Sequence, residues 1–266
     1  MDTTFTPADV AAFEHATWSR SAPGYEEGFA VLTREAVGPL LRAANVQAGT
    51  RLLDVGTGSG VVAATAREMG ADVVGIDFSE PMLVEARREV PDVEFRTAPA
   101  DNIPYGEASF EAVAANGVLH HLGEPDRALE EAHRVLTDGG RIACTVWAAP
   151  ETLEAFGLFF AAVEEHAGSA ELPHGPLFGV TDAETLSSLF TEAGFSDVEI
   201  ETIETTWKMP TIDPLLRAFG TWAQLDSFPA NTRTAIEDSV RSGAKAYETD
   251  GGLVVPNPMV LIAATR

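Results

Sequence analysis

The sequence has 266 residues and a formal net charge of −24, because 41 Asp and Glu residues outnumber 17 Lys and Arg residues. A surface this acidic repels a phosphate backbone, so the composition argues against a nucleic-acid partner. We find no apolar run of the roughly 20 residues that a membrane-spanning helix needs, and we expect no membrane partner. The single cysteine, Cys144, excludes an internal disulfide. The single cysteine, together with an N-terminus that lacks a basic, apolar leader, leads us to expect a cytoplasmic protein.

Short apolar runs alternate with helical stretches between residues 51 and 147, a pattern typical of βαβ units and a parallel sheet. Turn residues bound each run, and the pattern predicts strands at Arg51–Val55, Asp72–Asp77, Val93–Ala98, Phe110–Asn116 and Gly140–Trp147. Apolar residues at helical spacing predict the intervening helices at Gly60–Met69, Glu80–Glu89 and Glu124–Leu136.

The flanking segments complete the predicted domain. Residues 1–45 are expected to form an N-terminal helical cap, and residues 46–147 the ligand-binding core. Residues 148–180 are expected to be a lid insertion. Residues 181–266 should complete the sheet with strands near Val198–Trp207 and Met259–Thr265, around a second helical insertion at about 208–250. The sequence therefore predicts an α/β protein with a Rossmann-like, seven-stranded, mostly parallel sheet and helical insertions.

A glycine-rich motif, LDVGTGSG at residues 53–60, is the strongest functional signal. Its glycines, Gly56, Gly58 and Gly60, permit positive φ and let a ligand approach the backbone at the start of a helix. This alternate spacing differs from the G-x-G-x-x-G of dinucleotide folds, which makes a nicotinamide oxidoreductase the least favoured function. Asp54 precedes the loop and would repel a pyrophosphate but attract an ammonium group. The motif therefore predicts a ligand with a positively charged end.

Acidic and apolar residues follow the next two strands. Asp77 is placed to accept hydrogen bonds from ribose hydroxyls, and Asp101 to accept one from an adenine amino group. Phe78 and Met82 are candidates to line an adenine ring. Each has a plainer interpretation, as a cap or as core. Their order along consecutive strand ends, where open α/β sheets bind ligands, favours one nucleoside-binding site.

The segment 51–147 resembles the core of class I S-adenosylmethionine-dependent methyltransferases. The resemblance is strongest to the subfamily with ubiquinone and menaquinone C-methyltransferases and natural-product methyltransferases. The matching stretches are LLDVGTGSG, GIDFSEPML, APADNIPYGEASFEAV, NGVLHHL, AHRVLTDGG and, later, AGFSDVEIE. The resemblance implies an antiparallel last strand and S-adenosyl-L-methionine as cofactor. It places the cofactor site at Asp54, Gly56, Thr57, Gly58, Gly60, Asp77, Phe78, Met82, Ala100, Asp101, Asn102 and Asn116.

The same resemblance distributes these residues along the cofactor. Asp54 and the first two loop glycines would hold the methionine end, and Asp77 the ribose. Asp101 and Asn102 would contact the adenine edge. Asn116 would lie near the sulfonium.

Two adjacent histidines, His120 and His121, follow the fourth predicted strand. A hydroxyl or activated carbon that accepts a methyl group must lose a proton, which an imidazole can take. His121, and after it His120, is therefore the catalytic candidate, unless the pair only orders its loop or packs beneath the cofactor. No cluster has metal-ligand spacing, so we predict no metal. The N/D-P-P-Y/F motif of amino-directed nucleic-acid and protein-glutamine methyltransferases is absent, because Asn116 is followed by Gly-Val-Leu.

Aromatic side chains gather in and around the insertions. Most should be core, but a few are expected to face the cleft, with Phe178, Trp207 and Trp222 as the candidates to test. Trp18 and Tyr25 of the cap are expected to close over the cofactor. The full set is Phe156, Phe159, Phe160, Phe178, Trp207, Phe219, Trp222 and Phe228. The predicted function is methyl transfer to O, N or C of a small, largely apolar or aromatic metabolite, as in secondary metabolism. Two alternatives stay open, a non-methylating enzyme such as a cyclase and a non-enzymatic binding or regulatory protein. The sequence also leaves a homodimer open.

Overall fold

The structure is a computed structural model that describes residues 5–168, 172–177 and 179–266. Within these residues, the main sheet has seven strands in the order β3-β2-β1-β4-β5-β10-β6. Their bounds are β1 Arg51–Val55, β2 Asp72–Asp77, β3 Glu94–Thr97, β4 Phe110–Asn116, β5 Leu136–Trp147, β6 Ser196–Ile203 and β10 Met259–Thr265. β10 runs antiparallel to β5 and β6, and the other pairs are parallel. The predicted sheet, with its antiparallel last strand, is confirmed.

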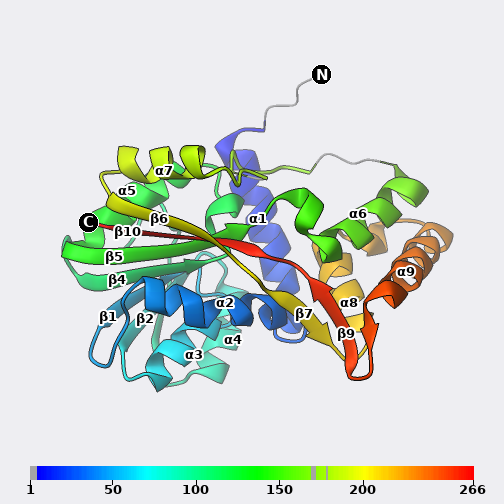
Figure 1. Ribbon diagram of the computed structural model, residues 1–266, viewed down its shortest axis with the longest axis horizontal. Helices are drawn as coiled ribbons and strands as arrows, with labels where there is room; N and C mark the ends of the chain where they lie inside the picture. Colours follow the sequence, from blue (N-terminus) through cyan, green and yellow to red (C-terminus); the bar gives the residue numbers. More distant parts are fainter. Residues whose placement is uncertain (1–4, 169–171, 178) are drawn as a thin grey trace.

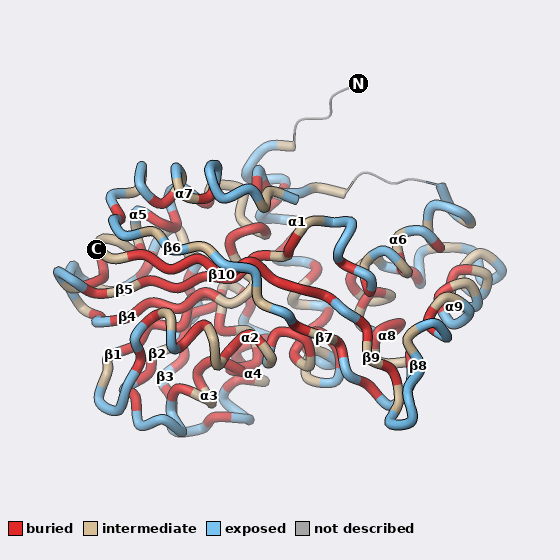
Figure 2. The backbone as a smooth tube through the Cα atoms, viewed as in Figure 1, coloured by how far each residue is buried: buried red, intermediate tan, exposed pale blue. Residues whose placement is uncertain are grey.

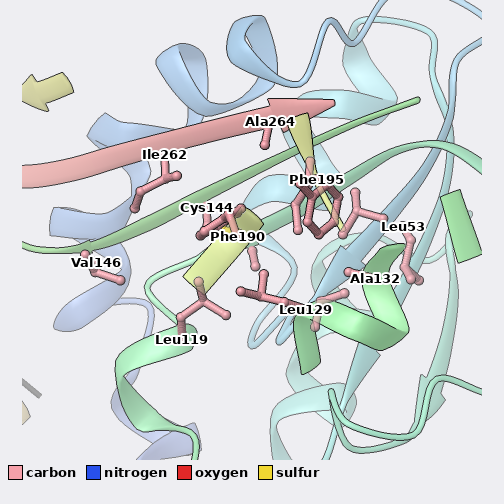
Figure 3. Packing of buried hydrophobic residues seen from close by; sticks show 14 of the residues in the cluster. Leu53, Leu119, Leu129, Ala132, Cys144, Val146, Phe190, Phe195, Ile262 and Ala264 are labelled. Atoms are coloured by element: carbon pink, nitrogen blue, oxygen red, sulfur yellow. The ribbon is translucent and has the colours of Figure 1, made fainter. Parts of the chain in front are cut away.

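Helices cover both faces of the main sheet (Figure 1). One face carries α2 Phe29–Ala43, α3 Val61–Glu68 and α4 Glu80–Glu89, and the other carries α5 Pro125–Val135 and α7 Ala183–Glu192. Each face buries its own apolar cluster. Figure 3 shows side chains of β5, β10, α5 and α7 meeting in one of them. Burial on both faces explains why the central strands β1, β4 and β10 are mostly apolar, whereas the edge strands β3 and β6 carry exposed polar residues.

A smaller antiparallel sheet lies beside the main one. It has the order β7-β9-β8, with β7 Thr206–Met209, β8 Glu248–Thr249 and β9 Gly252–Pro256. The helices packed with it are α6 Glu154–Ala167, α8 Asp213–Trp222 and α9 Ala230–Ala244. The insertion predicted as helical at about 208–250 therefore begins and ends in strands. The strand predicted at Val198–Trp207 is divided between β6 and β7, because the chain leaves the main sheet after Ile203.

The N-terminal cap begins with α1 Pro7–Ser21. Thr6 and Asp9 form a reciprocal capping box at its start, and Pro7 occupies the first turn, where no backbone donor is needed. α1 contacts α4 of the main sheet and α8 of the smaller unit, so it crosses the junction between them (Figure 1). Figure 2 shows that the central strands are largely buried, whereas much of α6 and α9 faces solvent.

Short 3₁₀ turns join several elements: η1 Ala22–Gly24, η2 Leu119–His121, η3 Pro150–Thr152, η4 Leu225–Ser227 and η5 Lys245–Tyr247. The turn η2 follows β4 after two residues and carries the histidine pair. Within the described ranges, no helix combines the length and apolar character required to span a bilayer.

Candidate functional site

A cavity of about 660 Å³ lies between α1 and the carboxyl ends of β1, β2, β4 and β5. Apolar side chains form much of its wall, among them Trp18, Phe29, Val118, Leu122 and Trp147. Its titratable lining residues other than tyrosine are Glu14, His15, Asp77, Asp101, His121 and Glu124. Among the described residues, no lysine or arginine lines the cavity. The described wall is therefore largely apolar with acidic groups and two histidines, and it offers an anionic ligand neither a lysine nor an arginine.

The glycine loop forms the floor of this cavity. Gly56 has a φ of 64°, and a Cβ atom there would lie 2.5 Å from Cγ2 of Val118, closer than real Cβ atoms approach. Only glycine fits both the backbone angle and the space. The backbone N–H of Gly58 donates to Oδ2 of Asp77 at 2.9 Å, which ties the loop to the end of β2.

Asp54 lies beneath this loop and is only 1% exposed. Its Oδ2 accepts from Oγ1 of Thr57 at 2.6 Å and from the backbone N–H of Ala63 at 3.2 Å. Its Oδ1 is buried without a hydrogen-bond partner among the described residues. Burial raises the pKa of Asp54 to about 7, and the nearby Asp77 carboxyl acts in the same direction. One face of this carboxyl is thus chemically unsatisfied.

Asp77 occupies the end of β2 and lines the cavity. Its Oδ1 accepts from the backbone N–H of Ser79 at 2.8 Å, and its Oδ2 is bound by Gly58. Burial raises the pKa of Asp77 to about 6, although the two backbone donors and His15 oppose this rise. The His15 ring lies 5.5 Å from the ring of Phe78, so α1 closes this end of the cavity.

Asn116 ends β4 and also lines the cavity. Its Nδ2 donates to the backbone carbonyl of Thr33 at 2.9 Å, and its Oδ1 accepts from Oγ1 of Thr145 at 2.6 Å. Both ends of the amide are held by the protein. The side chain is therefore fixed in orientation at the cavity wall.

The structure brings eight of the twelve predicted cofactor residues to the cavity: Gly56, Gly58, Asp77, Phe78, Met82, Ala100, Asp101 and Asn116. The other four, Asp54, Thr57, Gly60 and Asn102, are not part of its lining. Asp54 and Thr57 are bonded to each other below the loop, and a Cβ on Gly60 would meet Val90 and Ala86. Asn102 is exposed to solvent.

The two predicted catalytic histidines have different surroundings. His121 lines the cavity, and its Nδ1 lies 3.1 Å from Oε1 of Glu14. His120 does not line the cavity and is 2% exposed, with neither ring nitrogen bonded among the described residues. Burial lowers the pKa of His120 well below its usual range. Its ring lies between His121 and Trp147, with centroids at 4.1 and 5.5 Å, so it packs behind the wall.

The cap and the insertions contribute unequally. Trp18 and Tyr25 line the cavity as expected, and Glu14 and Phe29 join them without having been predicted. Helical spacing could have predicted Glu14, because residues 11, 14, 15 and 18 lie on one face of α1 and all line the cavity. The interpretation of Trp207 and Trp222 as cleft residues is wrong: they are 0% and 8% exposed in the core of the smaller unit. Phe178 lies outside the described residues.

Metal ligation finds no support in the described ranges, where no group of three or more His, Cys, Asp and Glu side chains is arranged to hold an ion.

The sequence comparisons agree on a methyltransferase family, and the structural comparisons agree on the fold. Residues 53–144 match the methyltransferase domain family. A demethylmenaquinone methyltransferase of Clavibacter sepedonicus is 34% identical over 190 residues, 66% of this chain and 75% of that protein. The Haemonchus contortus phosphoethanolamine N-methyltransferase 2, solved with S-adenosylhomocysteine, superposes with a TM-score of 0.55 at 20% identity, covering 87% of this chain and 52% of that one. The cyclase SpnF superposes with a TM-score of 0.55 at 23% identity, covering 87% and 80%.

Proposed function

Because the chain belongs to the class I S-adenosylmethionine-dependent methyltransferases, we propose that it methylates an uncharged, hydroxyl-bearing molecule of apolar or aromatic character. The observation that carries this proposal is the cavity beside the glycine loop, which combines a largely apolar wall, His121 and no lysine or arginine among the described residues. A phosphate or carboxylate buried there would meet several carboxylates and no lysine or arginine among the described residues, which is costly in a desolvated site.

The residues around the loop fit the family's cofactor. The Asp54 carboxyl is buried behind the loop with its Oδ1 unpartnered, and its charge favours the ammonium of the methionine end. Asp77 presents a carboxylate at the wall for the ribose hydroxyls, and Asp101 presents one for the adenine amino group. Phe78 and Met82 supply apolar and sulfur contacts for the ring. We assign these roles on the same proposal.

Bound S-adenosylmethionine supplies an electrophilic methyl group on a sulfonium leaving group. The protein's own contribution is to align the acceptor, exclude water and take up a proton. The ring of His121 lines the cavity, and its Nε2 makes no hydrogen bond within the described ranges. We assign it as the base: the acceptor O–H bond breaks as Nε2 takes the proton, and the oxygen gains the methyl group. If a ring carbon gains the methyl group instead, that carbon then loses its C–H proton to water, and the imidazolium returns the first proton to the oxygen, which restores the aromatic ring.

The substrate class follows from the wall and from the relatives. The C. sepedonicus protein acts, by its name, on a demethylated menaquinone, an uncharged aromatic ring system. The H. contortus enzyme was solved with phosphomonomethylethanolamine, whose phosphate would find no lysine or arginine in the described lining of this cavity. We therefore place the acceptor among phenols and quinols.

The test is isotope transfer from S-adenosylmethionine carrying a ¹³C-methyl group, read by mass spectrometry. A reduced naphthoquinone without a ring methyl is offered beside phosphomonomethylethanolamine. We expect label in the naphthoquinol, at carbon or oxygen, and none in the phosphorylated amine. Preferential labelling of the phosphorylated amine, or conversion of the quinol without label, would contradict the proposal.

A further inference from the structure

One carboxylate joins the cap helix to the histidine of the cavity. Glu14 of α1 has a side chain 7% exposed, and its two oxygens have different partners. Oε1 lies 3.1 Å from Nδ1 of His121, and Oε2 accepts from Nε1 of Trp18 at 2.8 Å. Glu14 and His121 are 107 positions apart in the chain, so it is the packing of α1 against the cavity that brings them together.

We propose that Glu14 is a positioning residue, which fixes His121 in the tautomer with its proton on Nδ1 and its lone pair on Nε2. This inference rests on the proposed function, in which His121 takes the acceptor's proton. Glu14 lines the same cavity, but we assign it no contact with the reacting atoms.

The hydrogen-bond chemistry dictates the tautomer. An indole N–H can only donate, so Nε1 of Trp18 donates to Oε2 of the Glu14 carboxylate. Oε1 only accepts when Glu14 is ionised, so the Nδ1 atom facing it must carry a proton. Nε2, without a bond to any described residue, then keeps its lone pair for the cavity.

The surroundings hold the ring in place. The Trp18 ring meets the His121 ring edge-on, with centroids 5.1 Å apart and an interplanar angle of 80°. His120, whose ring lies 4.1 Å away, is neutral because burial lowers its pKa well below the usual range. Glu14 is therefore the charge in direct contact with the imidazole, and it stabilises the imidazolium that forms when Nε2 takes the proton.

The variant Glu14→Gln tests the tautomer sharply. Trp18 still needs an acceptor, so it keeps the amide oxygen and leaves the NH₂ group facing Nδ1 of His121. Nδ1 must then accept, and the proton moves to Nε2, where it blocks the base. In the double variant Glu14→Gln/Trp18→Phe, the amide is free to turn its oxygen to Nδ1, which returns the proton to that atom.

The measurement is the ¹⁵N spectrum of the His121 imidazole in the full chain with S-adenosylhomocysteine, at about pH 8. We expect a protonated Nδ1 in the wild type, a protonated Nε2 in Glu14→Gln and a protonated Nδ1 in the double variant. Glu35→Gln is the matched control, because Glu35 is a half-buried carboxylate that binds Thr206 and Lys208 outside the cavity. Its His121 spectrum should equal the wild type's.

Turnover of the naphthoquinol gives the second readout. We expect Glu14→Gln to lower kcat about 10²-fold, with the KM and the S-adenosylhomocysteine affinity within about two-fold. Two results would overturn the inference about Glu14: a wild-type spectrum with the proton on Nε2, or an unchanged tautomer in a folded Glu14→Gln protein. If His121→Ala is inactive in the same assay, either result leaves the base assignment intact. Full turnover by His121→Ala would instead overturn the base assignment in the proposed function.

Discussion

The buried carboxyl of Asp54 should make the cofactor-free protein less stable than its asparagine variant. Both donors to this side chain, Thr57 and the backbone N–H of Ala63, bind the same oxygen, Oδ2. In Asp54→Asn the amide oxygen can take that position and keep both hydrogen bonds. The NH₂ group then occupies the place of Oδ1, which has no partner among the described residues. The substitution thus removes a buried charge with little change in shape.

The magnitude follows from the pKa. Burial raises the pKa of Asp54 from its ordinary value of 3.8 to about 7, so the folded state holds the proton more tightly than the unfolded chain. The free energy of unfolding of the wild type therefore falls as the pH rises through this window. At about 1.4 kcal/mol per pKa unit, the full effect is about 4 kcal/mol, of which about 3 kcal/mol lies between about pH 5 and pH 8.

Urea unfolding of both cofactor-free proteins at these two pH values measures the effect. The advantage of Asp54→Asn over the wild type should grow by about 3 kcal/mol from the lower to the higher pH. Calorimetry should show the opposite effect on function, with S-adenosylhomocysteine bound about 10- to 100-fold more weakly, because its ammonium loses a charged partner. An advantage that does not change with pH would refute the buried-charge reasoning, and unchanged affinity would refute the role of Asp54.

Three further substitutions test other parts of the site and the fold. Asp77→Asn should weaken S-adenosylhomocysteine binding by about 1.5–3 kcal/mol in calorimetry. Both carboxylate oxygens of Asp77 already accept backbone N–H groups, so the amide of the variant would turn its NH₂ group toward one of these donors. Gly56→Ala should lower the free energy of unfolding by about 1–3 kcal/mol, and Val118→Ala should restore part of it, because the new Cβ meets Val118. Trp222→Ala should lower the free energy of unfolding by about 3–5 kcal/mol in urea and leave the choice of methyl acceptor unchanged, because Trp222 is a core residue. Altered selectivity at unchanged stability would contradict this assignment.

The main sheet could be predicted because its signals are local. The strands β1, β2 and β4 are short, mostly apolar runs between turn residues. The order Gly56, Asp77, Asp101 along the chain becomes a spatial cluster through parallel topology alone. The smaller sheet was missed because β7 and β9 pair across about 45 residues, and a four- or five-residue strand gives too few alternations to stand out.

The other gaps in the prediction arise from tertiary packing. A role for Glu14 follows only from its contact with His121, and no local sequence pattern predicts that contact. The two histidines look equivalent in sequence, yet η2 turns one to the cavity and the other into the core. Trp207 is aromatic like a pocket residue, but its place in β7 buries it among Phe29 and Phe219.

A crystal structure of the full chain with S-adenosylhomocysteine is the most direct measurement of where the methyl group is delivered. We expect the adenosyl group against Phe78 and Asp77 and the amino acid end over the Asp54 loop. The sulfur should face the part of the cavity that Asn116 and His121 line, with room beside His121 for a ring-sized acceptor. A ligand bound outside this cavity, or one whose sulfur points away from His121, would contradict methyl transfer at this site.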